Sequence, residues 1–317
     1  MKSVLVTAIG SFSSDIVIKT LKKLNYYVIG CDINQKELIV DSNNVDFFYQ
    51  VPKVSDREEY TKKIMEICNK HKVDYIIPLL DIEVDFFNEN KSLFDKQLIC
   101  IPPSDSLLLC RDKYKFQQFI KELDYVNGID TDFVYNVDAD SLRYPVVCKT
   151  IDGRSSEGLK VFDKKEEYVA FSKLCDDNYI VENFIDGNIV TVDVVRDNNN
   201  NVVSISREEL IRTVNGAGLS VYVFYDEELE SICNKLASDL GIIGCVNFEF
   251  IKTKEGKYYI IECNPRFSGG IEFSCMAGYD FVGNYLKCFT SIIDNLMPYK
   301  NQYIARKYEE YIMKIED

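Results

Sequence analysis

Short apolar runs alternate with amphipathic segments along the first hundred residues of the chain. The pattern predicts strands at 4–7, 27–31, 75–80 and 98–101, and helices that begin near Ser13 and at Arg57. Alternating strands and helices are typical of βαβ units, in which parallel strands form one sheet with helices on both faces. This part of the chain therefore predicts a Rossmann-like α/β layer.

From residue 112 onward, strands follow one another more directly and only two helices are expected, at 112–123 and 227–240. The strands are expected at 145–149, 159–162, 179–181, 189–196, 202–206, 245–251 and 258–262. Turn signals, such as the asparagine-rich stretch 197–201, join neighbouring strands into antiparallel hairpins. The second part of the chain therefore predicts an α+β fold.

Composition narrows the class of protein. No apolar run reaches the roughly 18 residues of a membrane span, and we expect neither a membrane partner nor a signal peptide. The chain has 37 Lys and Arg against 51 Asp and Glu, and its net charge of −14 disfavours nucleic acid as a partner. Eleven cysteines without a CxxC pair indicate reduced thiols in a cytoplasmic protein.

The chain has a single histidine, His71, which is expected to be exposed near a helix end. Because there is only one, multi-histidine metal sites are excluded, and an exposed histidine does not suit a histidine triad. A dinucleotide-binding layer is one alternative for the N-terminal part, because Gly10 follows a strand and Asp32 closes the next one. Only one glycine stands where the GxGxxG fingerprint has three. A nicotinamide-dependent enzyme is therefore disfavoured.

A hairpin of strands 246–251 and 257–264 brings acidic side chains together. A two-residue turn at 255–256 would place Glu249 directly opposite Glu262, with Asn264 on the same face. A three-residue loop would break this parity. The opposite, core-facing side of the hairpin is expected to carry Phe248, Phe250, Ile261 and Cys263.

Two carboxylates opposite each other repel unless a cation lies between them. Glu249, Glu262 and the amide oxygen of Asn264 are hard ligands that suit Mg²⁺, or Mn²⁺, bound also to phosphate oxygens. The alternative is a pair of acids facing water. Cys263 has no histidine near it in sequence to act as a base, and we expect it to pack in the core.

Lys149 ends an apolar strand directly before the polar turn 152–158, which contains Ser155 and Ser156. A cation beside a turn with exposed backbone N–H groups is typical of a phosphate cradle, although lysines at strand ends are common. Lys113 lies at a helix start, where it opposes the helix dipole, and this misfit hints at another role.

The order of these motifs resembles the ATP-grasp family. The segments are Asp-Lys at a helix start, Pro-Val-Val-Cys-Lys149, the polar turn, Val-Glu-Asn-Phe-Ile-Asp-Gly187, Phe-Glu249-Phe and Ile-Glu262-Cys-Asn-Pro-Arg266. The resemblance covers 107–270 and is closest to the carbamoyl-phosphate synthetase large subunit and stand-alone carboxylate–amine ligases. It implies a preATP-grasp domain at 1–106, a small subdomain at 107–182 and a large subdomain with the metal site at 183–317.

The resemblance also implies roles for single residues. Lys113 and Lys149 would contact ATP phosphates under the turn that holds Ser155 and Ser156. Glu182 and the backbone at Phe184 and Ile185 would hold adenine. The hairpin ligands would bind two Mg²⁺ ions, and Arg266 would stabilise the transferring phosphoryl group. Ile189 replaces the acid that usually contacts the ribose, Thr150 replaces a usual proline, and the turn has only two glycines.

Substrate residues are less well defined. Arg212 would meet a carboxylate or acyl phosphate, or else be a surface arginine. Asp81 and Glu83 follow a strand at its carboxyl end and could receive an ammonium group, but an acidic helix N-terminus is the favoured interpretation.

We expect an ATP- and Mg²⁺-dependent ligase that joins a small carboxylate to an amine through an acyl phosphate. One alternative is a kinase of a small carboxylate or carbamate, similar to carbamoyl-phosphate synthetase. The other is a nucleotide-binding regulator without turnover. The sequence identifies neither substrate and leaves the oligomeric state open, with a homodimer as one option.

Overall fold

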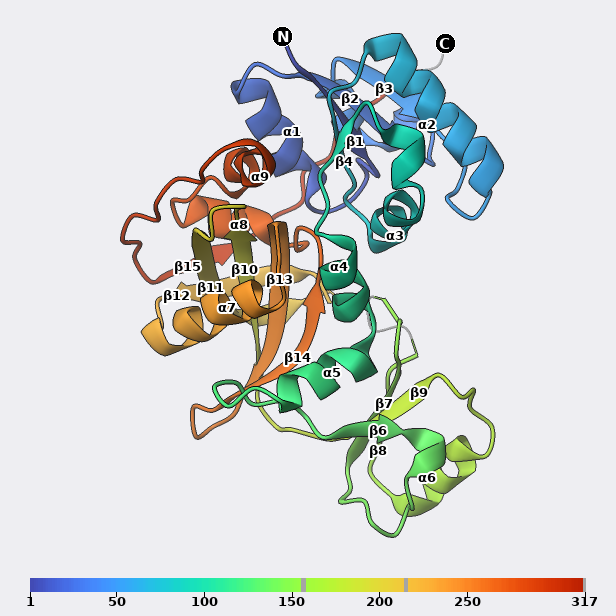
Figure 1. Ribbon diagram of the computed structural model, residues 1–317, viewed down its shortest axis with the longest axis vertical. Coiled ribbons are helices and arrows are strands. Elements are labelled where there is room, and N and C mark those ends of the chain that lie inside the picture. The colour runs from blue at the N-terminus through green and yellow to red at the C-terminus, as the bar shows by residue number, and fades with distance from the viewer. Residues whose placement is uncertain (155–157, 214–215, 316–317) are drawn as a thin grey trace.

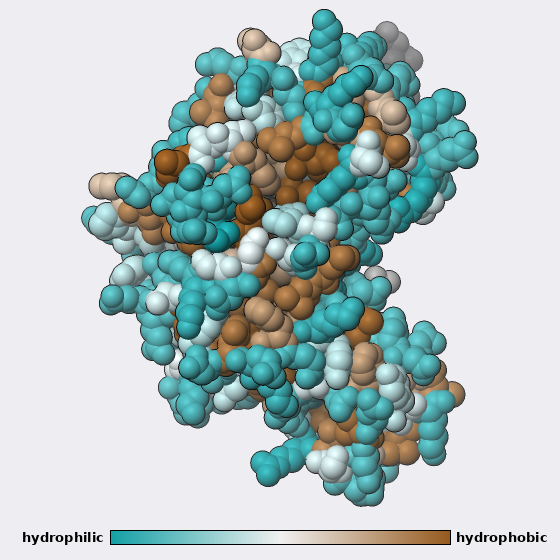
Figure 2. Space-filling model, in the orientation of Figure 1, coloured by the Kyte–Doolittle hydropathy of each residue, from teal (hydrophilic) through white to brown (hydrophobic). Residues whose placement is uncertain are grey.

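The structure is a computed structural model and describes residues 1–154, 158–213 and 216–315. Its strands form three sheets that follow one another along the long axis of the molecule (Figure 1). In the space-filling view, a notch on one side sets the end with the third sheet apart from the rest (Figure 2). The predicted order, an α/β layer followed by an α+β part, is confirmed.

The first sheet is parallel, with strand order β3-β2-β1-β4-β5. Its strands are β1 (Ser3–Thr7), β2 (Tyr27–Asp32), β3 (Phe47–Gln50), β4 (Tyr75–Ile77) and β5 (Leu98–Ile99). Side chains alternate between its faces, so that Val4 and Val6 pack with helix α1 (Ser14–Lys23) and Leu5 packs with α2 (Arg57–His71). The expected layer with helices on both faces is confirmed, although β4 is shorter than predicted.

The second sheet is antiparallel and has the order β14-β13-β10-β11-β12-β15. Its strands are β10 (Asn188–Arg196), β11 (Val202–Arg212), β12 (Gly218–Phe224), β13 (Gly244–Lys252), β14 (Tyr258–Asn264) and β15 (Gln302–Ala305). Helix α7 (Glu227–Asp239) covers one face. Part of the other face, with Val195 and Ile205, shares one continuous core with α1, α8 (Ile271–Met276) and α9 (Phe281–Thr290).

The third sheet is antiparallel, with the order β6-β9-β7-β8. Its strands are β6 (Thr131–Phe133), β7 (Val146–Thr150), β8 (Lys160–Phe162) and β9 (Tyr179–Asn183), and α6 (Lys165–Ser172) packs on it. Three further helices are α3 (Asp81–Glu89), α4 (Ser104–Arg111) and α5 (Lys113–Lys121). Short 3-10 turns lie at Lys36–Leu38, Val40–Asn43, Lys91–Phe94 and Val134–Asn136.

One expectation about the surface is wrong. His71 is half-buried rather than exposed, because it lies among the rings of Tyr27, Phe47 and Tyr49 at the edge of the first sheet. The Tyr49 hydroxyl and His71 Nε2 are 2.8 Å apart, and burial lowers the pKa of His71. The ring is therefore part of an aromatic cluster.

Candidate active site

The β13–β14 hairpin has the predicted pairing of Glu249 with Glu262, but the turn that produces it differs from the predicted one. Its loop has three residues, 254–256, closed by the bond from Thr253 N to Lys257 O, so the expected two-residue turn is wrong. A β-bulge at Ile261 adds one residue to β14 and restores the parity. Glu249 therefore does lie opposite Glu262, as expected.

The bulge is held by a side chain that the sequence did not single out. Gln117 of α5 is buried, and its Nε2 donates to the carbonyls of Ile260 at 2.8 Å and Ile261 at 3.2 Å. Its Oε1 accepts from the backbone N–H of Ile129 at 2.9 Å. Gln117 thus satisfies backbone groups that the irregular ladder leaves free, and it fixes where Glu262 points.

Cys263 faces the core, as expected, beside Phe248 and Phe250. Burial raises the pKa of its thiol well above the ordinary value, which disfavours a thiolate nucleophile. The bulge changes one assignment, because Ile260 rather than Ile261 is fully buried on this side.

The two hairpin carboxylates each meet a cation from another element. Lys113 Nζ lies 3.5 Å from Glu262 Oε2, and Arg212 Nη2 lies 3.3 Å from Glu249 Oε2. Asn264 Nδ2 donates to Glu262 Oε1 at 3.1 Å. The structure therefore brings together the three predicted metal ligands with Lys113 and Arg212.

The pKa shifts of the carboxylate pair run in opposite directions. Burial, and then the charge of Glu262, raise the pKa of Glu249. Burial opposes ionisation of Glu262 as well, but Lys113 and Lys149 outweigh it and lower its pKa. The described residues include no group of three His, Cys, Asp or Glu side chains suited to a metal. Two carboxylates and an amide oxygen nevertheless fit Mg²⁺ that takes its remaining ligands from phosphate and water.

The two lysines approach from different sides. Lys113 Nζ donates to the carbonyl of Gly153 in the polar turn at 2.6 Å, and burial lowers the pKa of its ammonium. Lys149, at the end of β7, forms a buried ion pair with Glu182 at 2.7 Å. Thr131 Oγ1 donates to the other oxygen of Glu182 at 3.0 Å. Ser155 and Ser156, expected in the phosphate cradle, lie outside the described residues.

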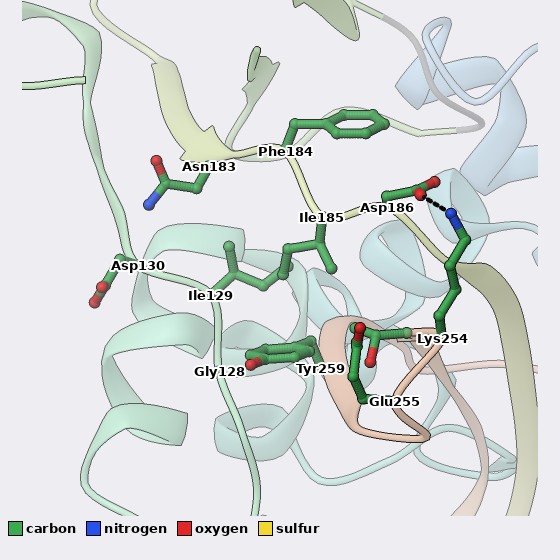
Figure 3. Close-up of a pocket in the computed structure, with 11 residues that line it drawn as sticks. Gly128, Ile129, Asp130, Asn183, Phe184, Ile185, Asp186, Lys254, Glu255 and Tyr259 are labelled. Atoms are coloured by element: carbon green, nitrogen blue, oxygen red, sulfur yellow. Dashed lines mark hydrogen bonds and ion pairs between the residues drawn. The ribbon is translucent and has the colours of Figure 1, made fainter. Parts of the chain in front are cut away.

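The connector between β9 and β10 holds the expected adenine-binding residues. Figure 3 shows the side chains of Phe184 and Ile185 pointing to opposite sides of it, with Ile185 directed toward Ile129 and Tyr259. These residues line a cavity of about 560 Å³, and the ion pair of Asp186 and Lys254 lies at its edge.

Beyond this connector, the chain passes very close to β13. A Cβ on Gly187 would lie 2.4 Å from the carbonyl oxygen of Lys252, so only glycine fits there. Ile189 pairs with Ile251, and the ribose acid of the family has no counterpart at this position.

Arg266 is paired with the N-terminal layer. Its Nε and Nη2 both lie 2.8 Å from Oδ2 of Asp81, the first residue of α3. Glu83 is buried two residues further on, in the same first turn, where it accepts from Thr7 Oγ1 at 2.7 Å and from Tyr60 OH at 3.0 Å. The favoured interpretation of both acids as an acidic helix start is confirmed, and Glu83 is not placed to receive an ammonium group.

A second residue missed from the sequence is Arg207. It is almost fully buried and pairs with Asp193 and with Glu209, whose Oε1 is 3.0 Å from Arg207 Nε. Thr191 Oγ1 donates to the same Glu209 oxygen at 3.0 Å, and Thr191 lies opposite Glu249 in the sheet. The only local signal is an arginine where Val203 and Ile205, in the same alternation, are apolar.

The N-terminal loop does not offer a dinucleotide site. The backbone N–H of Gly10 donates to Asp32 at 2.9 Å, and the other Asp32 oxygen accepts two bonds from Asn34. The acid and the amide that a dinucleotide would use are thus occupied by each other.

Two family descriptions match the chain. Residues 4–101 match the "PylC-like, N-terminal domain", and residues 176–310 match "ATP-grasp in the biosynthetic pathway with Ter operon". The carbamoyl phosphate synthase large chain of Clostridium beijerinckii is 23% identical over 274 residues, which cover 81% of this chain and 25% of that relative. This chain thus spans about a quarter of the length of the curated relatives it matches.

Solved structures agree in fold. Biotin carboxylase from Campylobacter jejuni superimposes with a TM-score of 0.75 and 20% identity, covering 90% of this chain and 70% of that one. The L-amino acid ligase from Bacillus licheniformis gives a TM-score of 0.71 and 17% identity, covering 91% and 74%. Within the described residues, no helix is long and apolar enough to cross a membrane.

Proposed function

We propose that this chain, an ATP-grasp protein with a PylC-like N-terminal domain, is an ATP- and Mg²⁺-dependent ligase. In this proposal it joins a small carboxylate to an amine. The observation that carries the proposal is the meeting of Lys113 with Glu262, opposite Glu249 and beside Asn264. Hard oxygen ligands and a buried ammonium lie there side by side, as phosphoryl transfer requires.

Each side chain has a role in this proposal. Mg²⁺, or Mn²⁺, would be coordinated by Glu249, Glu262 and Asn264 and would neutralise phosphate charge. Lys113 and Lys149 bind phosphate oxygens, and the connector at Phe184 and Ile185 holds adenine. Because Lys113 and Lys149 are already paired with acids, the nucleotide exchanges these partners rather than ordering free side chains.

The chemistry needs no covalent nucleophile from the protein. The carboxylate substrate attacks the γ-phosphorus of ATP, ADP leaves, and the amine then displaces phosphate from the acyl phosphate. Arg266 and Arg212 stabilise the charge that moves in the first step. Cys263 takes no part because it faces the core. The fold shared with an L-amino acid ligase supports amino acids as the first substrates to test.

ADP release with ATP, Mg²⁺ and a panel of amino acids and small carboxylates, singly and in pairs, tests the proposal. Release that needs both a carboxylate and an amine supports the ligase. Release with a carboxylate or carbamate alone supports the kinase, which the likeness to carbamoyl phosphate synthase favours as second candidate. ATP binding without turnover of any compound on the panel would instead support a nucleotide-binding regulator.

The metal assignment is tested by Glu262→Gln, which keeps the size of the side chain and removes its charge. We expect Mg²⁺-dependent ADP release to fall by about two orders of magnitude or more. Glu227→Gln, exposed on α7, should match the wild type. Normal turnover in Glu262→Gln would refute the metal site.

A further inference from the structure

A residue of the N-terminal domain reaches the phosphoryl-transfer centre. Asp81 and Arg266 are 185 residues apart, yet two guanidinium nitrogens of Arg266 lie 2.8 Å from one oxygen of Asp81. The side chains are 7% and 19% exposed, so the pair is largely shielded from water. The only other side-chain bond of Arg266 goes from Nη1 to the carbonyl of Phe267 at 3.0 Å, within the described part of the chain.

The ion pair is not needed to dock the two domains. Apolar side chains of the first sheet and α1 already form one continuous core with α8, α9 and the second sheet. A buried ion pair adds little net stability, because desolvation offsets much of the attraction. What the hydrogen bond from Nε to Asp81 Oδ2 does supply, with Nη2 at ion-pair distance from the same oxygen, is a preferred orientation of the planar guanidinium.

Asp81 is itself held in its charged form by a second arginine. Arg111, at the end of α4, places Nη1 3.6 Å from Asp81 Oδ1, and that oxygen is buried without a hydrogen-bond partner. Burial would raise the pKa of Asp81, but Arg266 and Arg111 outweigh it and lower the pKa. The carboxylate thus stays ionised between two cations.

We propose that Asp81 is a positioning residue for Arg266. The N-terminal domain sets the plane of the Arg266 guanidinium, two residues beyond Asn264, so that it meets the transferring phosphoryl group. This inference rests on the proposed function and deepens it, because turnover by the ATP-grasp part then depends on a side chain of the N-terminal domain.

Asp81→Asn tests the role, because it keeps the shape of the side chain and removes its charge. We expect kcat for substrate-dependent ADP release to fall about 30-fold, with KM for ATP changed less than about threefold, since a misdirected group lowers the rate more than ground-state binding. Asp81→Glu should recover part of the loss. The control is Glu89→Gln. Glu89 lies on α3, as Asp81 does, and forms an exposed ion pair with Arg57, so this variant should match the wild type.

A second measurement separates orientation from stability. In Arg266→Ala, added guanidinium chloride at low concentration should restore part of the turnover, because Asp81 can hold the free cation. In Arg266→Ala combined with Asp81→Asn, the rescue should be lost. Equal rescue in both backgrounds, or an Asp81→Asn enzyme with wild-type kcat, would overturn the positioning role while leaving the ligase intact.

The same assays distinguish failure of the inference from failure of the proposed function. A wild-type chain that binds ATP but turns over nothing on the panel refutes the function, and the positioning role falls with it. If Asp81→Asn loses its cooperative melting transition, Asp81→Glu carries the comparison of kcat and of guanidinium rescue.

Discussion

The cations proposed to act on ATP and substrate all have acidic partners within the protein. Lys113 pairs with Glu262, Lys149 with Glu182, Arg212 with Glu249 and Arg266 with Asp81. A site of this kind is preassembled, because the side chains are ordered before any ligand binds. Binding then exchanges one counter-charge for another, and the affinity for ATP depends on how weakly each acid holds its cation.

Glu83 provides a pH-dependent test at the residue scale. Burial raises its pKa to about 7 from an ordinary value of 4.5. The proton that the folded chain retains stabilises it below about pH 4.5, and this contribution is lost as pH rises through about 7. The loss amounts to roughly 3 kcal/mol of unfolding free energy for a shift of this size.

Glu83→Gln should therefore flatten the pH dependence of the urea midpoint between about pH 4.5 and pH 7 relative to the wild type. The slope is the readout, because an amide also changes the bonds to Thr7 and Tyr60. Glu66→Gln, exposed on α2, should keep the wild-type slope. Parallel curves for wild type and Glu83→Gln would contradict the buried, protonated carboxyl.

At the scale of elements, the β13–β14 hairpin depends on α5. Gln117→Leu would leave the carbonyls of Ile260 and Ile261 buried without a donor, which costs about 1–3 kcal/mol. We expect a lower melting temperature and weaker Mg²⁺-dependent nucleotide binding in calorimetry, because the bulge sets the direction of Glu262. Gln118→Leu, next to it and with one bond of 3.3 Å to Thr131 O, should have little effect. Equal losses in both variants would mean that the bonds from Gln117 to the bulge do not determine metal binding.

This hairpin also shows how far sequence patterns reach. Alternation placed Glu249, Glu262 and Asn264 on one face and Cys263 in the core, which the structure confirms. The predicted length of the loop was wrong, and the bulge in β14 restores the alternation. A hydrogen bond from Gln117 of α5 supports this bulge, and no local sequence pattern indicates that bond. The acidic partner of Arg266 comes from a distant element, and so does β15, which pairs with β12. Such pairings depend on tertiary packing, and periodicity along one segment does not contain them.

At the scale of the whole molecule, the third sheet stands apart from the other two (Figure 1). The first and second sheets share a core, whereas the third has a core of its own. Lys149 lies on this separate sheet, and Glu262 lies on the second one. In the proposed complex, a nucleotide that contacts both would bridge the two parts, and a shared ligand favours the conformation in which both contacts are made.

Small-angle X-ray scattering tests this bridging. A non-hydrolysable ATP analogue with Mg²⁺ should reduce the radius of gyration by about 1 Å, as expected for closure of one small subdomain. Lys149→Met combined with Glu182→Gln removes the phosphate contact without leaving a buried acid unpaired, since both side chains of the pair are neutralised. This double variant should keep its melting temperature to within a few degrees and show no compaction. Full compaction in the double variant would mean that Lys149 does not join the two parts through the nucleotide.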